Sequence, residues 1–326
     1  NGKILKMNYK LKKISGDASF REFYRLKKNN KTSIIVSAKK EKFKNLLVYA
    51  AINNVLNNNK INAPKLLSNY YKNDMIEISD LGEKSFYDHV ISKKNRFNSY
   101  KSLIKLLIKI QKIKVKKLYK FGKLKIKLPM YTLTNLHKES DLFFDWYLKY
   151  FIKNKRIKKI KKILKSELNK AYKKLNYKND TFVHRDFHIS NVMINKKKLG
   201  IIDSQDAIIG NPLYDVASLI DDVRIKLPNK LKKRLLDFYY KNSKIKNDKI
   251  QKLRNDFDIL SVQRNLKILG IFVRLYKRDN KDSYLKFLPY TWALIEERLQ
   301  NPTLKSLKIS FYKHLPVKKL KRFNKK

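Results

Sequence analysis

The stretch of sequence that decides the fold is FVHRDFHISNVMINKKKLGIIDSQDAIIGNPLYDVASL, which runs from Phe182 to Leu219. Asp186 stands on a loop, and Asn191 follows it just before two short predicted strands joined by a Lys-rich turn. Asp203 ends the second of these strands. A loop followed by a hairpin brings such side chains to one edge, so we expect a single site that contains all three.

These three side chains have the chemistry that phosphoryl transfer needs. That reaction requires a positioned nucleophile and neutralised phosphate charge rather than covalent work by the protein. Asp186 is the predicted catalytic base, because it can accept the proton of a substrate hydroxyl. Asn191 and Asp203 offer hard oxygen atoms to Mg²⁺, which bridges the ATP phosphates. A lone aspartate at position 186 would be interpreted as an ordinary turn or capping residue. The order and spacing of Asp186, Asn191 and Asp203 together favour a catalytic role.

Four other polar residues of the same segment surround the predicted site. We expect His184 to shape the loop through a hydrogen bond with the backbone rather than to act as the base. Neither a ligand role nor a surface role is favoured for His188. Asp206 either assists the metal or substrate or is structural. Asp215 either caps the helix that follows it or braces the catalytic loop.

The chain on both sides of this segment predicts an α+β protein with a two-lobed, protein-kinase-like fold. Apolar runs around turns predict one helix over 43–56 and strands over 20–26, 33–38, 65–67 and 75–78. Helical spacing of apolar residues predicts helices over 100–115, 150–175, 214–223, 230–240, 250–276 and 283–299. We therefore expect a small β-rich nucleotide-binding lobe at residues 1–79 and a larger, mostly helical catalytic and substrate-binding lobe at residues 80–326.

The composition limits the classes of protein to which the chain can belong. There is no Cys, which excludes disulfides and Cys-ligated zinc and fits a cytoplasmic protein. No apolar run approaches the ~20 residues that span a bilayer, so no membrane partner is expected. The formal charge of +52 comes mainly from Lys spread along the chain, which favours compositional drift over a specific nucleic-acid site. We also expect a monomer.

The segment around Asp186 resembles the Brenner-type motif of aminoglycoside and choline phosphotransferases, which are distant relatives of protein kinases. Further segments resemble in particular the bacterial N-acetylmuramate/N-acetylglucosamine anomeric kinases. They are GDASFR at 16–21, DLG at 80–82, LFFDWYL at 142–148, SQDA at 204–207 and QRNLKILG at 263–270. The resemblance implies transfer of the ATP γ-phosphate to the anomeric hydroxyl of an amino sugar, which gives a sugar 1-phosphate for cell-wall recycling.

The resemblance also implies where ATP binds. Backbone amides of an N-terminal turn would cover the phosphates, and the hinge would offer backbone groups to adenine. The residues assigned to ATP are Gly16, Asp17, Ser19, Arg21 and Glu77. The third-strand lysine that grips the phosphates in protein kinases has no obvious counterpart, because Ser37 and Ala38 follow the apolar run. Arg21 or Lys39 would replace it, and a solvent-exposed charge is the favoured interpretation of Lys39.

Four residues are predicted to bind the sugar, and they are Glu139, Asp145, Trp146 and Arg264. A carboxylate beside an aromatic plane suits sugar hydroxyls and a ring face. The alternative is that Trp146 belongs to the core and that the two acids lie on the surface. Arg264 lies in a predicted C-terminal helix and meets either the sugar or the catalytic loop.

Two other classes of function stay open from the sequence. One is a phosphotransferase of the aminoglycoside or choline type, although polycationic aminoglycosides need many carboxylates and the chain has 79 Lys and Arg against 27 Asp and Glu. The other is a protein without activity, either a pseudokinase or a basic nucleic-acid-binding module. The intact Asp186, Asn191 and Asp203 disfavour the pseudokinase, and the lack of an RNA-binding signature disfavours the nucleic-acid module.

Overall fold

The structure is a computed structural model that describes residues 9–14, 21–38, 44–116, 118–152, 154–195 and 198–322. The chain divides into two compact units, neither of which is continuous in sequence. The first unit consists of Asn1–Lys94, Lys116–Leu128 and Ile189–Ala207, and the second of Asn95–Val115, Pro129–His188 and Ile208–Lys326. The boundary placed between residues 79 and 80 from the sequence stays a prediction.

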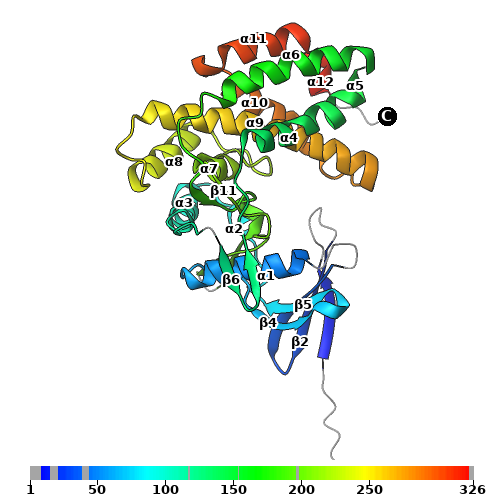
Figure 1. Cartoon of the computed structure of the whole chain (residues 1–326), viewed down its shortest axis with the longest axis vertical. Coiled ribbons are helices and arrows are strands. Elements are labelled where there is room, and N and C mark those ends of the chain that lie inside the picture. The colour runs from blue at the N-terminus through cyan, green and yellow to red at the C-terminus, as the bar shows by residue number, and fades with distance from the viewer. Residues whose placement is uncertain are drawn as a thin grey trace, which may run out of the picture. The chain divides into compact units, whose positions relative to one another are not determined.

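Five antiparallel strands form the sheet of the first unit, in the order β1-β2-β3-β5-β4 (Figure 1). They are β1 (Tyr9–Ile14), β2 (Glu22–Lys28), β3 (Lys31–Ser37), β4 (Leu66–Tyr70) and β5 (Met75–Ser79). Asn29 and Asn30 connect β2 to β3 with φ angles of 45° and 61°, the left-handed backbone that a tight hairpin turn requires. The predicted strands are thus confirmed, and β1 is an additional strand that the sequence analysis misses.

Helix α1 (Lys44–Asn58) packs against this sheet, as the apolar spacing of that segment predicts (Figure 1). The contact is an apolar cluster made by Ile34, Val36, Ala38, Leu46, Tyr49, Ile76 and Ile78. Full burial of one such large side chain contributes about 1.5–3 kcal/mol relative to leaving it exposed. The cluster therefore fixes α1, and with it Tyr49, against the sheet.

The predicted β-hairpin also belongs to the first unit, as β9 (Val192–Asn195) and β10 (Lys198–Ile201). It lies against the segment that follows β5. A Cβ atom at Gly200 would come within 2.7 Å of Leu81 Cδ1 and 2.8 Å of Asn62 Nδ2, so only glycine fits there without movement. The unit also contains η1 (Tyr71–Asn73), α2 (Phe86–Val90), β6 (Tyr119–Phe121), β7 (Leu124–Ile126) and η3 (Ile189–Asn191).

The second unit is mostly helical, which confirms the α+β class. Its α-helices are α3 (Phe97–Gln111), α4 (Leu133–Leu142), α5 (Lys149–Phe151), α6 (Asn154–Tyr172), α7 (Leu213–Ile220), α8 (Asn229–Asn242), α9 (Ile250–Asp279), α10 (Leu288–Arg298), α11 (Lys305–His314) and α12 (Val317–Lys321). A π-helix, η2 (Phe143–Leu148), links α4 to α5. Two short 3-10 helices, η4 (Leu285–Phe287) and η5 (Pro302–Leu304), and the antiparallel pair β8 (Thr181–Val183) and β11 (Ile208–Gly210) complete it.

Helix α9 is the central element of this unit, since α4, η2, α7 and α10 all pack against it. A Cβ atom at Gly270 would lie 2.3 Å from the backbone carbonyl of Leu142, so a glycine lets α9 approach α4 this closely. The predicted helix over 250–276 is therefore confirmed as a core element. Its buried polar residues Gln263 and Arg264 are held in fixed positions relative to α4 and α7.

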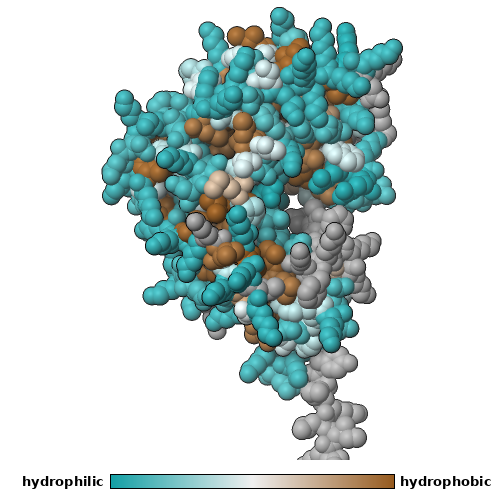
Figure 2. Space-filling view, viewed as in Figure 1, coloured by the Kyte–Doolittle hydropathy of each residue, from teal (hydrophilic) through white to brown (hydrophobic). Residues whose placement is uncertain are grey.

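Hydrophilic side chains cover much of the face shown in Figure 2, with smaller hydrophobic groups between them. The Lys-rich helix α6 illustrates the pattern, because Leu164 and Leu168 are fully buried while most of its lysines are half-buried or exposed. This pattern fits the interpretation of the lysines as a solvated surface. Within the part of the chain that the structure describes, no helix is both long and apolar enough to cross a membrane.

Candidate active site

The loop that contains Asp186 belongs to the second unit and follows strand β8. Asp215, in the first turn of α7, accepts hydrogen bonds from the backbone amides of His184 and Arg185 at 2.7 and 2.9 Å. Arg185 has a φ angle of 77°, a conformation that a non-glycine residue keeps only when its surroundings hold it. Asp215 therefore braces the loop, which is one of the two roles that the sequence left open.

Asp186 is half-buried, and its electrostatic surroundings are cationic. Burial by itself raises the pKa of this carboxyl, but the positive charges of Lys267 and Arg264 outweigh burial and leave its pKa below the usual value. The side chain is therefore an ionised hydrogen-bond acceptor at neutral pH. His188 donates its backbone N–H to the carbonyl of Asp186 at 3.0 Å, and burial holds the pKa of its ring well below the usual value.

Glu139 of α4 is the centre of a buried polar cluster beside this loop, with 6% of its surface exposed. It accepts hydrogen bonds from Arg185 Nη2 at 2.6 Å and from Lys267 Nζ at 3.1 Å. Three further donors are Tyr131, Tyr214 and Gln263, at 2.6, 2.9 and 3.0 Å. Burial opposes ionisation of Glu139, but Lys267 and Arg185 more than compensate and hold its pKa far below the usual value. Glu139 thus connects α4, α7 and α9 to the Asp186 loop.

The other predicted sugar residues lie in the same unit. Arg264 is buried, donates to the carbonyl of Arg185 at 3.0 Å and lies 4.8 Å from the centre of the Tyr214 ring. It therefore meets the catalytic loop, which is one of its two predicted contacts. Asp145 and Trp146 lie on the π-helix η2, where Asp145 is exposed and pairs with Lys161 at 2.7 Å. Trp146 is half-buried.

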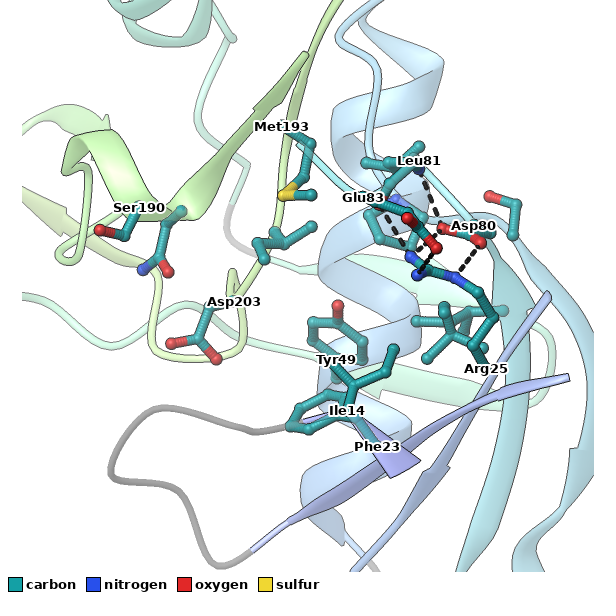
Figure 3. A pocket seen from close by; sticks show the side chains of 17 residues that line it. Ile14, Phe23, Arg25, Tyr49, Asp80, Leu81, Glu83, Ser190, Met193 and Asp203 are labelled. Atoms are coloured by element: carbon teal, nitrogen blue, oxygen red, sulfur yellow. Dashed lines mark hydrogen bonds and ion pairs between the residues drawn. The ribbon is translucent and has the colours of Figure 1, made fainter. Parts of the chain in front are cut away.

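The first unit contains a cavity of about 460 Å³, a size that suits a cofactor or other small ligand. Figure 3 shows its two polar sides: Asp203 and Ser190 lie on one, and Arg25, Asp80 and Glu83 lie on the other. Apolar side chains between them include Ile14, Phe23, Ile34, Ile78, Met193 and Ile202. A cavity with both apolar and polar lining residues suits a flat nucleotide base joined to charged phosphate groups.

Arg25 fixes the segment that lines one end of this cavity. Its guanidinium donates to both carboxylate oxygens of Asp80 at 2.6 and 3.1 Å and to the carbonyl of Gly82 at 3.0 Å (Figure 3). Gly82 adopts a φ of 101°, and its N–H donates to Asp80 at 2.9 Å. Arg25 is a residue that sequence reasoning misses, because its partners are more than 50 positions away. Glu77, which the sequence predicts as an ATP contact, accepts a hydrogen bond from Ser33 Oγ at 2.6 Å.

Asn191 and Asp203 are brought together, since both line this cavity. The N–H of Ile202 donates to the carbonyl of Asn191 at 3.0 Å, which ties the two segments together. Asp203 has a φ of 63°, and its Oδ1 accepts from Arg21 at 3.1 Å and from Gln205 at 3.0 Å. Gly16, Asp17, Ser19 and Lys39 lie outside the described residues.

The oxygen atoms of Asn191 and Asp203 fit Mg²⁺ in their chemistry, as two of the ligands that such an ion would need. Mg²⁺ is commonly bound by one or two carboxylates together with substrate phosphates rather than by an all-protein cage. The described part of the chain contains no group of three or more His, Cys, Asp or Glu side chains arranged to hold a metal. The amide oxygen of Asn191 and the carboxylate of Asp203 are hard donors of the kind Mg²⁺ prefers.

Comparison with known proteins agrees with this geometry. Residues 10–246, more than half of the chain, match the Phosphotransferase enzyme family (APH). The chain belongs to the phosphotransferase enzyme family. This confirms both the resemblance found in the sequence and the enzyme class.

Among curated proteins, this phosphotransferase is similar to the N-acetylmuramate/N-acetylglucosamine kinase of Pseudomonas aeruginosa, with 27% identity over 86% of this chain and 81% of that protein. It is also similar to the protein of the same name from Neisseria meningitidis, with 24% identity over 84% of this chain and 81% of that one. The similarity to these relatives therefore includes parts of both compact units.

Among solved structures, the phosphotransferase resembles a choline/ethanolamine kinase family protein from Mesorhizobium loti, with a TM-score of 0.61, 11% identity and 92% of each chain covered. It also resembles the ADP-bound aminoglycoside phosphotransferase APH(2'')-Ib, with a TM-score of 0.61 and 13% identity, over 93% of this chain and 95% of that one. These likenesses confirm the predicted kinase-like fold.

Proposed function

We propose that this phosphotransferase uses ATP to phosphorylate the anomeric hydroxyl of N-acetylmuramate or N-acetylglucosamine, in cell-wall sugar recycling. The observation that carries the proposal is similarity over more than 80% of the chain to kinases named for these two sugars. The residues that the proposal needs are present in the chain: Asp186 on its braced loop, and Asn191 and Asp203 beside one cavity.

Asp186 is the proposed catalytic base. Its carboxylate is ionised at neutral pH, because Lys267 and Arg264 lower its pKa. An ionised carboxylate can orient the sugar hydroxyl and accept its proton as the oxygen attacks phosphorus. Asp215 keeps the loop in its strained conformation by binding the amides of His184 and Arg185.

ATP is the proposed phosphate donor, with adenine in the apolar part of the cavity of the first unit. The solved structures of this fold include ADP-bound aminoglycoside phosphotransferases, which supports a nucleotide here. Asn191 and Asp203 are the residues that would hold Mg²⁺. When bound there, the ion neutralises the negative charge of the phosphates.

The charge around Asp186 favours an amino sugar over an aminoglycoside as acceptor. Arg185, Arg264 and Lys267 surround the loop with positive charge, and Glu139 is already paired with two of them. A polycationic aminoglycoside would meet electrostatic repulsion there, whereas a neutral or anionic sugar would not. Asp145 and Trp146 remain the proposed contacts with sugar hydroxyls and a sugar ring face, and Glu139 acts through Arg185 and Lys267.

An acceptor panel tests the proposal. The protein is incubated with ATP, Mg²⁺ and one acceptor at a time, and release of ADP is followed by a coupled assay. The panel contains N-acetylmuramate, N-acetylglucosamine, choline and an aminoglycoside. Turnover with the two N-acetyl sugars is expected, and turnover with choline or the aminoglycoside alone would contradict the proposal.

A further inference from the structure

Protein kinases bind the ATP phosphates with a cation that β3 and α1 do not supply in the part of the chain that the structure describes. In those enzymes a lysine on the third strand pairs with a glutamate on the neighbouring helix. Here β3 has the sequence KTSIIVS, in which the only lysine is Lys31, exposed at the first position of the strand. Helix α1, KNLLVYAAINNVLNN, contains no Asp, Glu or Arg, and its one lysine stands at its first position. The lysine–glutamate pair therefore cannot form between these elements.

Arg21, immediately before β2, contacts Asp203, one of the two residues proposed to hold Mg²⁺. Its side chain is 6% exposed, and its Nη2 lies 3.1 Å from Oδ1 of Asp203. The guanidinium carbon lies 5.6 Å from the centre of the Tyr49 ring of α1, a cation–π contact. Tyr49 and Asp203 both line the cavity, so the guanidinium group contacts two of the side chains that line it.

The groups that α1 offers to Arg21 and to the Asp203 turn are neutral. Tyr49 presents an uncharged ring that is 3% exposed. Asn53 accepts a hydrogen bond at 2.6 Å from Ser204, the residue after Asp203, and both side chains are buried. In the lysine–glutamate pair, the helix carboxylate partly neutralises the lysine. Helix α1 has no carboxylate, so it does not neutralise Arg21.

We propose that Arg21 takes the role of the third-strand lysine and binds the phosphates of ATP, with the Tyr49 ring in place of the helix glutamate. The inference rests on the proposed ATP-dependent function. A guanidinium group suits this role, because its planar fork of N–H donors can contact Asp203 and a phosphate oxygen at once. Asn53 and Ser204 keep α1, and therefore the ring, aligned with Asp203.

Nucleotide binding without sugar tests this inference by calorimetry with ATP·Mg²⁺, ADP·Mg²⁺ and adenosine. R21M is expected to weaken ATP binding by about 10- to 100-fold, the value of a lost charge-assisted contact, and to leave adenosine binding unchanged. R21K is expected to recover part of the loss, because it restores the charge without the fork. Y49L is expected to weaken ATP binding more than Y49F, since only phenylalanine keeps a ring under the guanidinium.

The matched control is R278M, the same chemical change at an exposed arginine that pairs with its neighbour Asp279. It is expected to bind ATP and adenosine like the wild type. ATP affinity in R21M equal to that of the wild type would overturn the inference alone. An equal loss of ATP and adenosine affinity in R21M and R21K would also overturn it, because it would indicate a structural role. A wild-type protein that binds no ATP·Mg²⁺ would overturn the proposed function itself.

Discussion

Replacement of Glu139 by alanine tests whether this residue is the structural centre of the second unit. The substitution removes the acceptor of Arg185 and Lys267, whose nitrogen atoms lie 2.6 and 3.1 Å from Glu139 Oε1. Breaking a buried ion pair by removing one partner typically destabilises a protein by about 3–5 kcal/mol, because the remaining charge is buried without compensation. Each kcal/mol lowers the thermal midpoint by about 2–4 °C in chains of 150–250 residues, so we expect a drop on the order of 10 °C.

Thermal unfolding of E139A and of the wild type is followed by circular dichroism. The KM for the sugar and kcat are measured for both proteins at a temperature below the start of unfolding. The matched control is E22A, because Glu22 lies on the surface and pairs with Lys13, and such pairs contribute at most about 1 kcal/mol. We expect a large loss of stability in E139A and a small one in E22A. Unchanged stability of E139A with a raised sugar KM would refute the reasoning and would instead indicate direct sugar binding.

The same network is expected to resist moderate acid. The pKa of Glu139 is depressed in the folded state, so its contribution to stability is fully present above the unfolded value near 4.5 and is lost only as the pH falls through the lower folded value. Wild type and E139A should therefore differ in unfolding free energy by a constant amount between about pH 5 and 8. A difference that disappears near neutral pH would contradict this assignment.

Two further predictions concern the Asp186 loop. D215A removes the acceptor of the buried His184 amide and of the partly buried Arg185 amide, at up to about 1–3 kcal/mol each. It is expected to lower both the thermal midpoint and kcat, whereas an unchanged kcat would remove Asp215 from its bracing role. D186N is expected to lower kcat/KM by about 10²–10⁴. The pKa of Asp186 is lowered, whereas burial raises the pKa of the bracing carboxyl of Asp215 to about 6, so an acid limb near pH 6 in the wild-type pH–rate profile is expected to come from Asp215. A limb near pH 6 that persists in D215N would contradict an ionised Asp186 base.

Local patterns in the sequence predict most of the elements that position the site. Asn29 and Asn30 mark the β2–β3 turn, and the apolar spacing from Leu46 to Val55 marks α1. The ordered set of Asp186, Asn191 and Asp203 predicts the chemistry, because its spacing reflects a loop followed by a hairpin. These features depend on neighbours within a few positions, which the sequence displays directly.

Features that depend on distant partners are not visible in the sequence. Glu139 reads as a surface or sugar-binding acid, yet its partners Arg185 and Lys267 are 46 and 128 positions away. The predicted helix over 150–175 begins later, at Asn154, because α5 ends at Phe151 and Ile152 has an extended backbone with φ −120° and ψ 137°. The contact of Arg21 with Asp203 joins residues 182 positions apart.

The position of the transferred phosphate tests the central claim most directly. N-acetylglucosamine and N-acetylmuramate are each incubated with the protein, ATP and Mg²⁺, and the products are analysed by ³¹P and ¹H NMR without purification. Phosphorylation of the anomeric hydroxyl predicts splitting of the H1 signal by phosphorus and loss of the reducing-end mixture of α and β forms. Phosphate on any other hydroxyl, or no phosphorylated product with either N-acetyl sugar, would contradict the assignment.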